Sequence, residues 1–196
     1  MTQDHKKRLT REDWILAGFR ALSRTGVAGL KAEALARELK TTKGSFYWHF
    51  SDVAGFQSAM LEYWQRRATE DIIAELDRDD RPVQEQLGTL LEHATSNDQS
   101  YGGRRAELAL REWGVADERV ASIVRDVDRS RIAFLRSRFL LSGLDERRAD
   151  LAAGGLYASL IGFDQLEMLG IAEARDGPRA MLELMLGAAP NDWGNI

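Results

Sequence analysis

Residues 30–50, LKAEALARELKTTKGSFYWHF, decide the fold of this chain. Apolar residues recur at the spacing of one helix face, which predicts a first short helix over residues 32–39. The Thr-Lys-Gly-Ser run then predicts a turn followed by a second helix over residues 42–49. A pair of short helices joined by a tight turn is typical of a helix-turn-helix, in which one helix braces the other.

The second of these helices has two different faces. Phe46 and Phe50 are four residues apart and share one face. We expect that face to close a three-helix core with Leu35, Leu39, Ile15 and Phe19. The opposite face carries, in varying degree, Lys43, Ser45, Tyr47, Trp48 and His49.

The residue types on this second face suit contacts with DNA. Lys43 can donate to guanine or to a phosphate, and Gly44 lets the backbone approach a base edge closely. Tyr47 offers a ring to a thymine methyl group, and the two residues after it suit contacts that fix register on the DNA backbone. The alternative is a plain helical hairpin with an aromatic core, and spacing alone does not separate the two.

The charge distribution favours the nucleic-acid interpretation. The formal net charge is −4, but residues 1–50 hold ten Lys and Arg against five Asp and Glu. The rest of the chain holds seventeen Arg against 26 Asp and Glu, and every lysine lies at or before Lys43. Phosphate contacts need only a local basic patch.

The remainder of the 196 residues is predicted to be helical as well. We expect an all-α fold of about nine helices, in which residues 1–50 form a helix-turn-helix DNA-binding domain and residues 51–196 a helical domain for effector binding and dimerisation. The other predicted helices cover residues 10–25, 51–76, 83–95, 104–113, 117–141, 146–169 and 178–187. Residues 1–8 are expected to form a mobile arm, and residues 188–196 a loose tail.

Several other function classes find little support. The chain has no cysteine, which excludes disulfides, thiolate metal sites and a cysteine nucleophile. Its three histidines are far apart in sequence, so we predict no catalytic residue, metal site or cofactor. The basic start is not followed by an apolar run, and the longest uncharged apolar run, residues 151–163, is too short to span a membrane. A cytoplasmic location is therefore expected.

The sequence Glu33-Ala34-Leu35-Ala36 followed by TKGSFYWHF resembles the TetR/AcrR family of bacterial transcriptional regulators. Residues 106–113, AELALREW, are similar to a subgroup of these regulators. The resemblance implies a homodimer formed by the last two helices, an operator of double-stranded DNA, and a small-molecule effector that releases the DNA. By position it assigns DNA contacts to Thr42, Lys43, Gly44, Ser45, Tyr47, Trp48 and His49.

Three positions depart from the family pattern. Lys40 stands where a glycine usually ends the first helix of the pair, and Lys31 replaces a Ser or Thr cap. Residues 51–55 lack the lysine that often binds phosphate there. We therefore add Lys31, Lys40 and Thr41 to the expected DNA-binding set, together with the basic arm.

The C-terminal half carries two further expectations. Gly154, Ala158 and Gly162 form a stripe of small residues that suits close helix packing across a dimer axis or, alternatively, inside one subunit. An apolar effector pocket is expected among Met60, Tyr63, Trp64, His93, Tyr101, Trp113, Phe134 and Phe163, although each of them alone suits an ordinary core.

Two functions follow from these observations. The first is a ligand-responsive DNA-binding transcriptional regulator, most simply a homodimeric repressor. An activator would need the same contacts with DNA. The alternative is an all-helical ligand-binding or interaction module without DNA-binding activity. No constellation of residues supports an enzyme.

Overall fold

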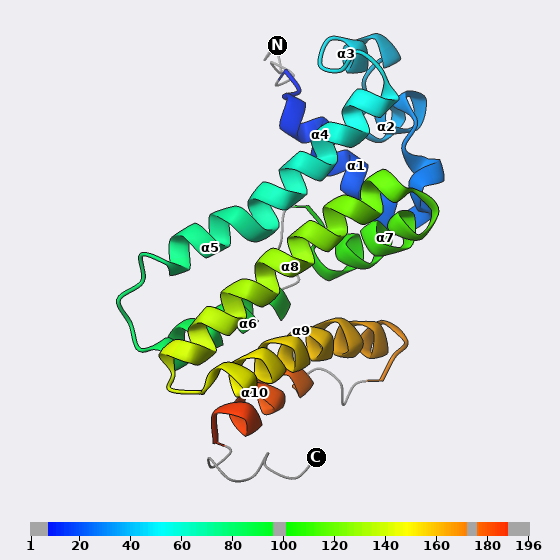
Figure 1. Cartoon of the computed structure of the whole chain (residues 1–196). Helices are drawn as coiled ribbons and strands as arrows, with labels where there is room; N and C mark the ends of the chain where they lie inside the picture. Colours follow the sequence, from blue (N-terminus) through cyan, green and yellow to red (C-terminus); the bar gives the residue numbers. More distant parts are fainter. Residues whose placement is uncertain (1–7, 96–100, 172–175, 188–196) are drawn as a thin grey trace, which may run out of the picture. The chain divides into compact units, whose positions relative to one another are not determined.

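A computed structural model describes residues 8–95, 101–171 and 176–187, and the regular structure within these ranges is entirely helical (Figure 1). The predicted all-α fold is thus confirmed. The predicted tail and residues 1–7 of the predicted arm lie outside the described residues. The elements are α1 (Arg11–Thr25), η1 (Val27–Gly29), α2 (Ala32–Glu38), α3 (Lys43–Tyr47), α4 (Val53–Gln65), η2 (Arg66–Glu70), α5 (Asp71–Leu76), α6 (Val83–Thr95), α7 (Gly103–Ala116), α8 (Glu118–Leu141), α9 (Glu146–Met168) and α10 (Gly177–Gly187).

Helix α1 begins and ends where its sequence predicts. The Thr10 side chain accepts a hydrogen bond from the Asp13 backbone N–H, and the Asp13 carboxylate accepts one from the Thr10 N–H at 2.7 Å. This reciprocal pair is a capping box, which satisfies donors that the first turn leaves free. Gly26 ends the helix with φ of 64°, a conformation that favours glycine.

The predicted single helix over residues 51–76 is interrupted. A π-helical turn, η2, separates α4 from α5. Arg131 of α8 donates to the Ala68 carbonyl at 3.0 Å and to the Thr69 hydroxyl at 2.9 Å, so the turn has partners for polar groups that lie inside the fold. The sequence pattern missed this turn because a π-turn keeps the helix direction and has no turn residues of its own.

The structure divides into two compact units, Met1–Arg66 with Asp98–Ile123, and Arg67–Asn97 with Val124–Ile196. These units are defined by contacts within each of them, whereas the predicted division at residue 50 separates functions and stays a prediction. In the first unit α1 packs against α2, α4 and α7. Gly18 of α1 permits a close approach to α4, because a Cβ there would lie 2.6 Å from atoms of Phe56 and Met60.

The second unit has its own apolar core, to which α6, α8, α9 and α10 contribute. Its buried members are Leu87, Leu91, Leu135, Phe139, Ala149, Ala152, Ala153, Leu156, Tyr157, Leu160, Leu182 and Met185. The gap between the predicted helices over residues 51–76 and 83–95 is present, since α5 ends at Leu76 and α6 begins at Val83.

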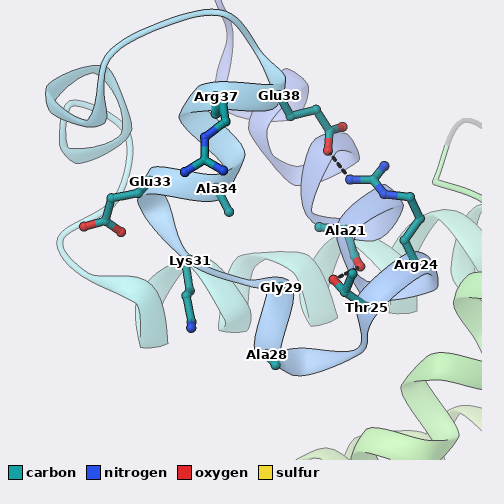
Figure 2. A pocket seen from close by; sticks show the side chains of 10 residues that line it. All are labelled: Ala21, Arg24, Thr25, Ala28, Gly29, Lys31, Glu33, Ala34, Arg37 and Glu38. Atoms are coloured by element: carbon teal, nitrogen blue, oxygen red, sulfur yellow. Dashed lines mark hydrogen bonds and ion pairs between the residues drawn. The ribbon is translucent and has the colours of Figure 1, made fainter.

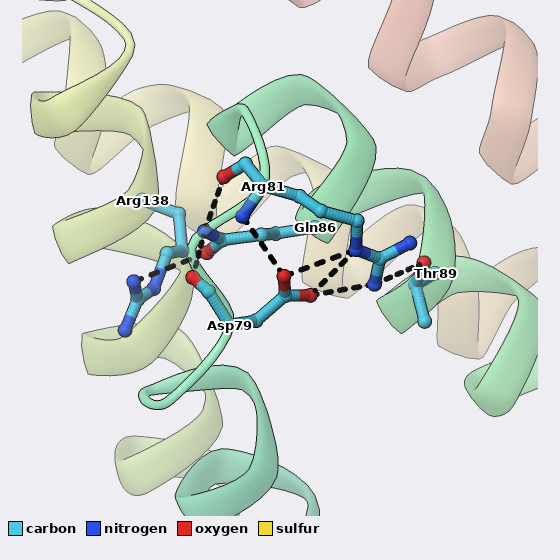
Figure 3. Close-up of polar contacts among 5 residues, drawn as sticks. All are labelled: Asp79, Arg81, Gln86, Thr89 and Arg138. Atoms are coloured by element: carbon cyan, nitrogen blue, oxygen red, sulfur yellow. Dashed lines mark hydrogen bonds and ion pairs between the residues drawn. The ribbon is translucent and has the colours of Figure 1, made fainter.

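A buried glutamine holds the turn between α5 and α6 together (Figure 3). The Gln86 amide donates to the carbonyls of Asp79 and Arg81, both at 2.8 Å, and its oxygen accepts from Arg138 of α8 at 3.2 Å. Arg81 in turn donates to the Asp79 carboxylate, a hydrogen bond that lowers the pKa of Asp79. The charged residues between α5 and α6 therefore form an ordered turn.

In the first unit, one carboxylate joins α2 to α1. Glu38 accepts hydrogen bonds from Arg20 at 2.8 Å and from Arg24 at 2.6 Å. Burial alone would raise the pKa of Glu38, but the hydrogen bonds from the two guanidinium groups outweigh it and hold the pKa below its usual 4.5. The ionised form is therefore favoured in the folded protein.

This arrangement predicts a specific pH dependence of stability. Because the folded-state pKa of Glu38 is lowered, its ion pairs stabilise the protein above the ordinary pKa and cease to do so as the pH falls through the lowered value. Glu38→Gln should reduce the free energy of unfolding by up to about 1 kcal/mol near neutral pH. It should also make the fall of Tm between about pH 5 and pH 3 shallower. Thermal melts followed by circular dichroism measure both, and a variant curve parallel to that of the wild type would contradict the assignment.

Candidate nucleic-acid interface

Helix α3 is held in place by one aromatic side chain. Phe46 is fully buried, and its ring centroid lies 5.4 Å from that of Trp14, 5.2 Å from that of Phe50 and 5.3 Å from that of Phe56. The predicted core residues Ile15, Phe19 and Leu35 are buried as well, and Leu39 is half-buried. Sequence analysis missed Trp14 and Phe56, although Trp14 lies four residues before the buried Gly18 on the inner face of α1.

The other side of α3 faces solvent. Tyr47 is 47% exposed and Trp48 is 82% exposed, although both directly follow the buried Phe46. Lys43 and Gly44 are exposed, while Ser45 and His49 are half-buried. The Thr42 hydroxyl accepts from the Ser45 N–H at 3.4 Å and caps the helix. The predicted residues thus share one accessible surface, and their contacts with DNA stay a prediction.

Lys40 adopts the strained conformation that its position implies. Its φ is 51°, and among the described residues other than glycine it alone has a positive φ. Its N–H donates to the Arg37 carbonyl at 3.2 Å, and the Thr41 N–H donates to the Ala36 carbonyl at 2.9 Å. These two bonds form a Schellman motif, which ordinarily places glycine at this point. At the other end of α2, Lys31 makes no side-chain capping hydrogen bond.

The start of α4 differs from a phosphate site. Asp52 caps the helix, its carboxylate accepting from the Gly55 N–H at 2.7 Å. A carboxylate therefore lies within residues 51–55, the segment in which the family often has a phosphate-binding lysine. Arg11 of α1 lies over the Phe50 ring and donates to the His49 carbonyl at 2.8 Å, which ties the end of the α3 segment to α1.

Sequence analysis also missed the partner of Lys43. The Lys43 ammonium forms an ion pair with Glu33 of α2, and it lies 5.9 Å from the centroid of the Tyr47 ring. The hydrogen bond from Lys43 is the main reason that the pKa of Glu33 is lowered. Glu33 belongs to the string that resembles the family, but its separation of ten residues from Lys43 is not a spacing that predicts a contact.

A surface hollow of about 870 Å³ lies between the end of α1, η1 and α2, and Glu33 is among the residues that line it (Figure 2). It is lined by Ala21, Arg24, Thr25, Ala28, Gly29, Lys31, Glu33, Ala34, Arg37 and Glu38. Small residues and charged residues both line it. Of the predicted site residues it includes Lys31, and it includes none of the predicted effector-binding residues.

The predicted effector-binding residues fall into both units. Met60, Tyr63, Trp64, Tyr101 and Trp113 are buried in the first, while Phe134, Phe163 and His93 belong to the second. In the first unit, Trp64 donates to the Glu107 carboxylate at 2.8 Å and Tyr63 donates to Glu12 at 2.8 Å. In the second, Phe134 is buried, Phe163 is half-buried and His93 is exposed. A pocket that these residues share stays a prediction.

The described residues contain neither a cluster suited to a metal ion nor a helix suited to a membrane. Among the residues that the structure describes, no cluster of three or more histidine, aspartate or glutamate side chains is arranged to hold a metal ion. None of the helices in residues 8–95, 101–171 and 176–187 combines the length and the apolar character needed to cross a membrane.

The segment that contains the exposed face of α3 is similar to a known family. Residues 15–55 match the family described as bacterial regulatory proteins, tetR family. The match covers 41 of the 196 residues, so the likeness to the tetR family is one of this helix-turn-helix segment. The matched residues run from α1 to the first turn of α4. They include the Schellman motif at Lys40, the capped helix α3 and the buried Phe46. A comparison with curated proteins found no significant sequence match.

Solved structures share the fold of the chain. A protein from a Rhodococcus species, described as a TetR-family transcriptional regulator, is 18% identical, with a TM-score of 0.70 over 90% of this chain and 98% of its own. The reduced form of NemR from E. coli is 19% identical, with a TM-score of 0.72 over 89% and 96%. A transcriptional regulator from Saccharomonospora viridis, in complex with choline, is 17% identical, with a TM-score of 0.69 over 95% and 96%. The chain therefore has the fold of tetR-family transcriptional regulators.

The strain at Lys40 can be tested by substitution. Lys40→Gly should raise the free energy of unfolding by about 1 kcal/mol, because glycine adopts a positive φ without the steric cost of a Cβ. Lys40→Ala is the matched control, since it removes the charge but keeps the Cβ, and it should leave stability near that of the wild type. Urea denaturation measures the difference. Equal stability of the Gly and Ala variants would contradict the strain.

Proposed function

We propose that this chain is a ligand-responsive DNA-binding transcriptional regulator that acts as a homodimeric repressor. One observation carries the proposal: a tetR-family segment in which a buried Phe46 leaves Lys43, Tyr47 and Trp48 on an accessible face. In helix-turn-helix proteins the second helix enters the major groove with its N-terminal residues at base edges. Lys43 is the first residue of α3 and has the donor that guanine O6 and N7 accept.

The chemistry of this face divides between base contacts and backbone contacts. Lys43 and Gly44 begin the helix that enters the groove, so they are proposed to reach base edges. Tyr47 and Trp48 lie at its far end and expose large rings, which suit contacts to thymine methyl groups and to the sugar-phosphate backbone. Lys31, Lys40 and Thr41 flank the helix and are proposed to hold phosphates.

Substitutions on this face should weaken operator binding without unfolding the protein. Lys43→Ala should weaken binding to the operator about tenfold, which corresponds to the loss of one base contact of roughly 1–3 kcal/mol. Tyr47→Ala should act in the same direction. Fluorescence anisotropy over a salt series, with DNA that flanks the coding region of the chain, measures both the affinity and the number of phosphate contacts.

The same measurement separates the two candidate functions. Glu62→Ala, on the exposed part of α4, is the control and should bind as the wild type does. If the Lys43 and Tyr47 variants also bind as the wild type does, α3 is not the recognition helix. If the wild type shows no salt-dependent binding to any duplex, the alternative of a helical ligand-binding or interaction module is favoured. The Asp52 cap at the start of α4 is the observation that supports this alternative.

The surface of α9 and α10 supports the proposed homodimer. Leu151 and Leu184 are exposed although both are large and apolar. Nothing lies within 4 Å of a Cβ built at Gly154 or Gly162, so the small-residue stripe is open in the described part of the subunit. An open apolar surface with small residues permits close approach of a second copy about a two-fold axis.

A pair of leucines with equal exposure tests this surface. Leu184 of α10 and Leu141 at the end of α8 are both 65% exposed. Leu184→Glu should convert the protein to a monomer, because it buries a charge in the proposed interface, whereas Leu141→Glu should leave a dimer. Sedimentation equilibrium gives the mass of each variant. A monomeric wild type, or a dimeric Leu184→Glu variant, would contradict the interface.

The proposed effector is a small molecule bound by the helical domain in the cytoplasm. The similar structure from Saccharomonospora viridis holds choline, which supports a small-molecule site in proteins of this fold. The aromatic and apolar residues proposed for the pocket suit a partly hydrophobic ligand. Effector binding that favours one arrangement of the subunits would change the affinity for DNA. DNA binding would change the affinity for the effector by the same factor.

A further inference from the structure

The proposed recognition helix carries an acidic neighbour on its DNA-facing side. Glu33, in the first turn of α2, forms an ion pair with Lys43, the first residue of α3. The Glu33 side chain is 57% exposed and that of Lys43 is 50% exposed, so the pair lies at the surface. Because DNA is a polyanion, a carboxylate at this place opposes binding to every sequence.

The geometry of the pair gives Glu33 a positioning role. An ammonium group has three donors, and the pair with Glu33 engages one of them. Lys43 also lies 5.9 Å from the centroid of the Tyr47 ring, so two side chains fix where its charge lies. A lysine side chain loses rotamer entropy when it is immobilised. A lysine that is already paired has lost part of this freedom before DNA arrives.

Charge around Glu33 favours its ionised form. The hydrogen bond from Lys43 is the largest cause of the lowered pKa of Glu33, and the charge of Lys31 acts in the same direction. Glu33 also raises the pKa of Lys43. One carboxylate therefore offsets the charge of two lysines that the proposed function assigns to DNA.

We propose that Glu33 is a positioning residue that determines sequence specificity: it holds the Lys43 ammonium for a base contact and lowers the affinity for arbitrary DNA. This inference rests on the proposed DNA-binding function. In a complex with the correct sequence, Lys43 keeps its pair with Glu33 and donates its remaining hydrogens to the base. On an arbitrary sequence, no acceptor lies at the point where Lys43 is held, and the repulsion between Glu33 and the phosphates remains.

The test compares two duplexes of equal length, one selected by the wild-type protein from a random pool and one with the same bases scrambled. In fluorescence anisotropy, Glu33→Gln should bind the scrambled duplex about threefold more tightly, because the repulsion is lost and Lys43 is free to reach a phosphate. The slope of log affinity against log salt should steepen by about 0.9 on that duplex. Binding to the selected duplex should stay equal or weaken, so the ratio of the two affinities falls.

Two controls separate positioning from charge alone. Glu62→Gln makes the same change of net charge on the exposed part of α4, and it should leave the ratio of affinities unchanged. In a Lys43→Met background, Glu33→Gln should tighten binding to both duplexes equally, because no ammonium remains to be positioned. Thermal melts of each variant confirm that it is folded.

The outcomes distinguish this inference from the proposed function. If the wild type binds DNA but Glu33→Gln keeps the wild-type ratio, or lowers it equally in the Lys43→Met background, Glu33 has no positioning role and the inference fails alone. An equal fall of the ratio in Glu62→Gln would also overturn it. If the wild type selects no sequence from the pool, the proposed function fails and the inference fails with it.

Discussion

The burial of Phe46 is the constraint on which the rest of this structure depends. Helix α3 has five residues, too few to be stable by its own hydrogen bonds. It exists because one ring packs among aromatic rings of α1, α4 and the segment that follows α3. Fixing that ring also fixes the opposite face, so Tyr47 and Trp48 are turned outward by the residue beside them. The core and the proposed interface are thus two sides of one short helix.

Charge is arranged around this helix with opposing effects. Lysines at positions 31, 40 and 43 are proposed to attract phosphates, while Glu33 and Asp52 place carboxylates in the neighbouring helix α2 and at the start of α4. A face built only for affinity would omit the carboxylates, since each of them repels DNA. Their presence, one paired with Lys43 and the other capping α4, is consistent with an interface in which contacts with bases outweigh contacts with phosphate. The acidic remainder of the chain limits further non-specific attraction.

Local sequence predicted the features that depend on local chemistry. The bounds of α1, and the place of Lys40 where glycine usually ends a helix, each follow from a few adjacent residues. The pair of Glu33 with Lys43 and the packing of Trp14 on Phe46 depend on how helices cross, which residue spacing does not encode. The π-turn at η2 is supported by Arg131, more than sixty residues away, and therefore left no local pattern. The eight residues proposed for the effector pocket were chosen by residue type. Residue type does not show which side chains lie together, so the shared pocket stays a prediction.

The central claim is that the outward face of α3 contacts DNA. Hydroxyl-radical footprinting of the protein, alone and bound to a selected duplex, measures this most directly, because Tyr47 and Trp48 are reactive and exposed. We expect both side chains to lose most of their reactivity in the complex, while Val115, which is exposed at the end of α7, keeps its own. Trp48 that remains as reactive in the complex as in the free protein would contradict the claim.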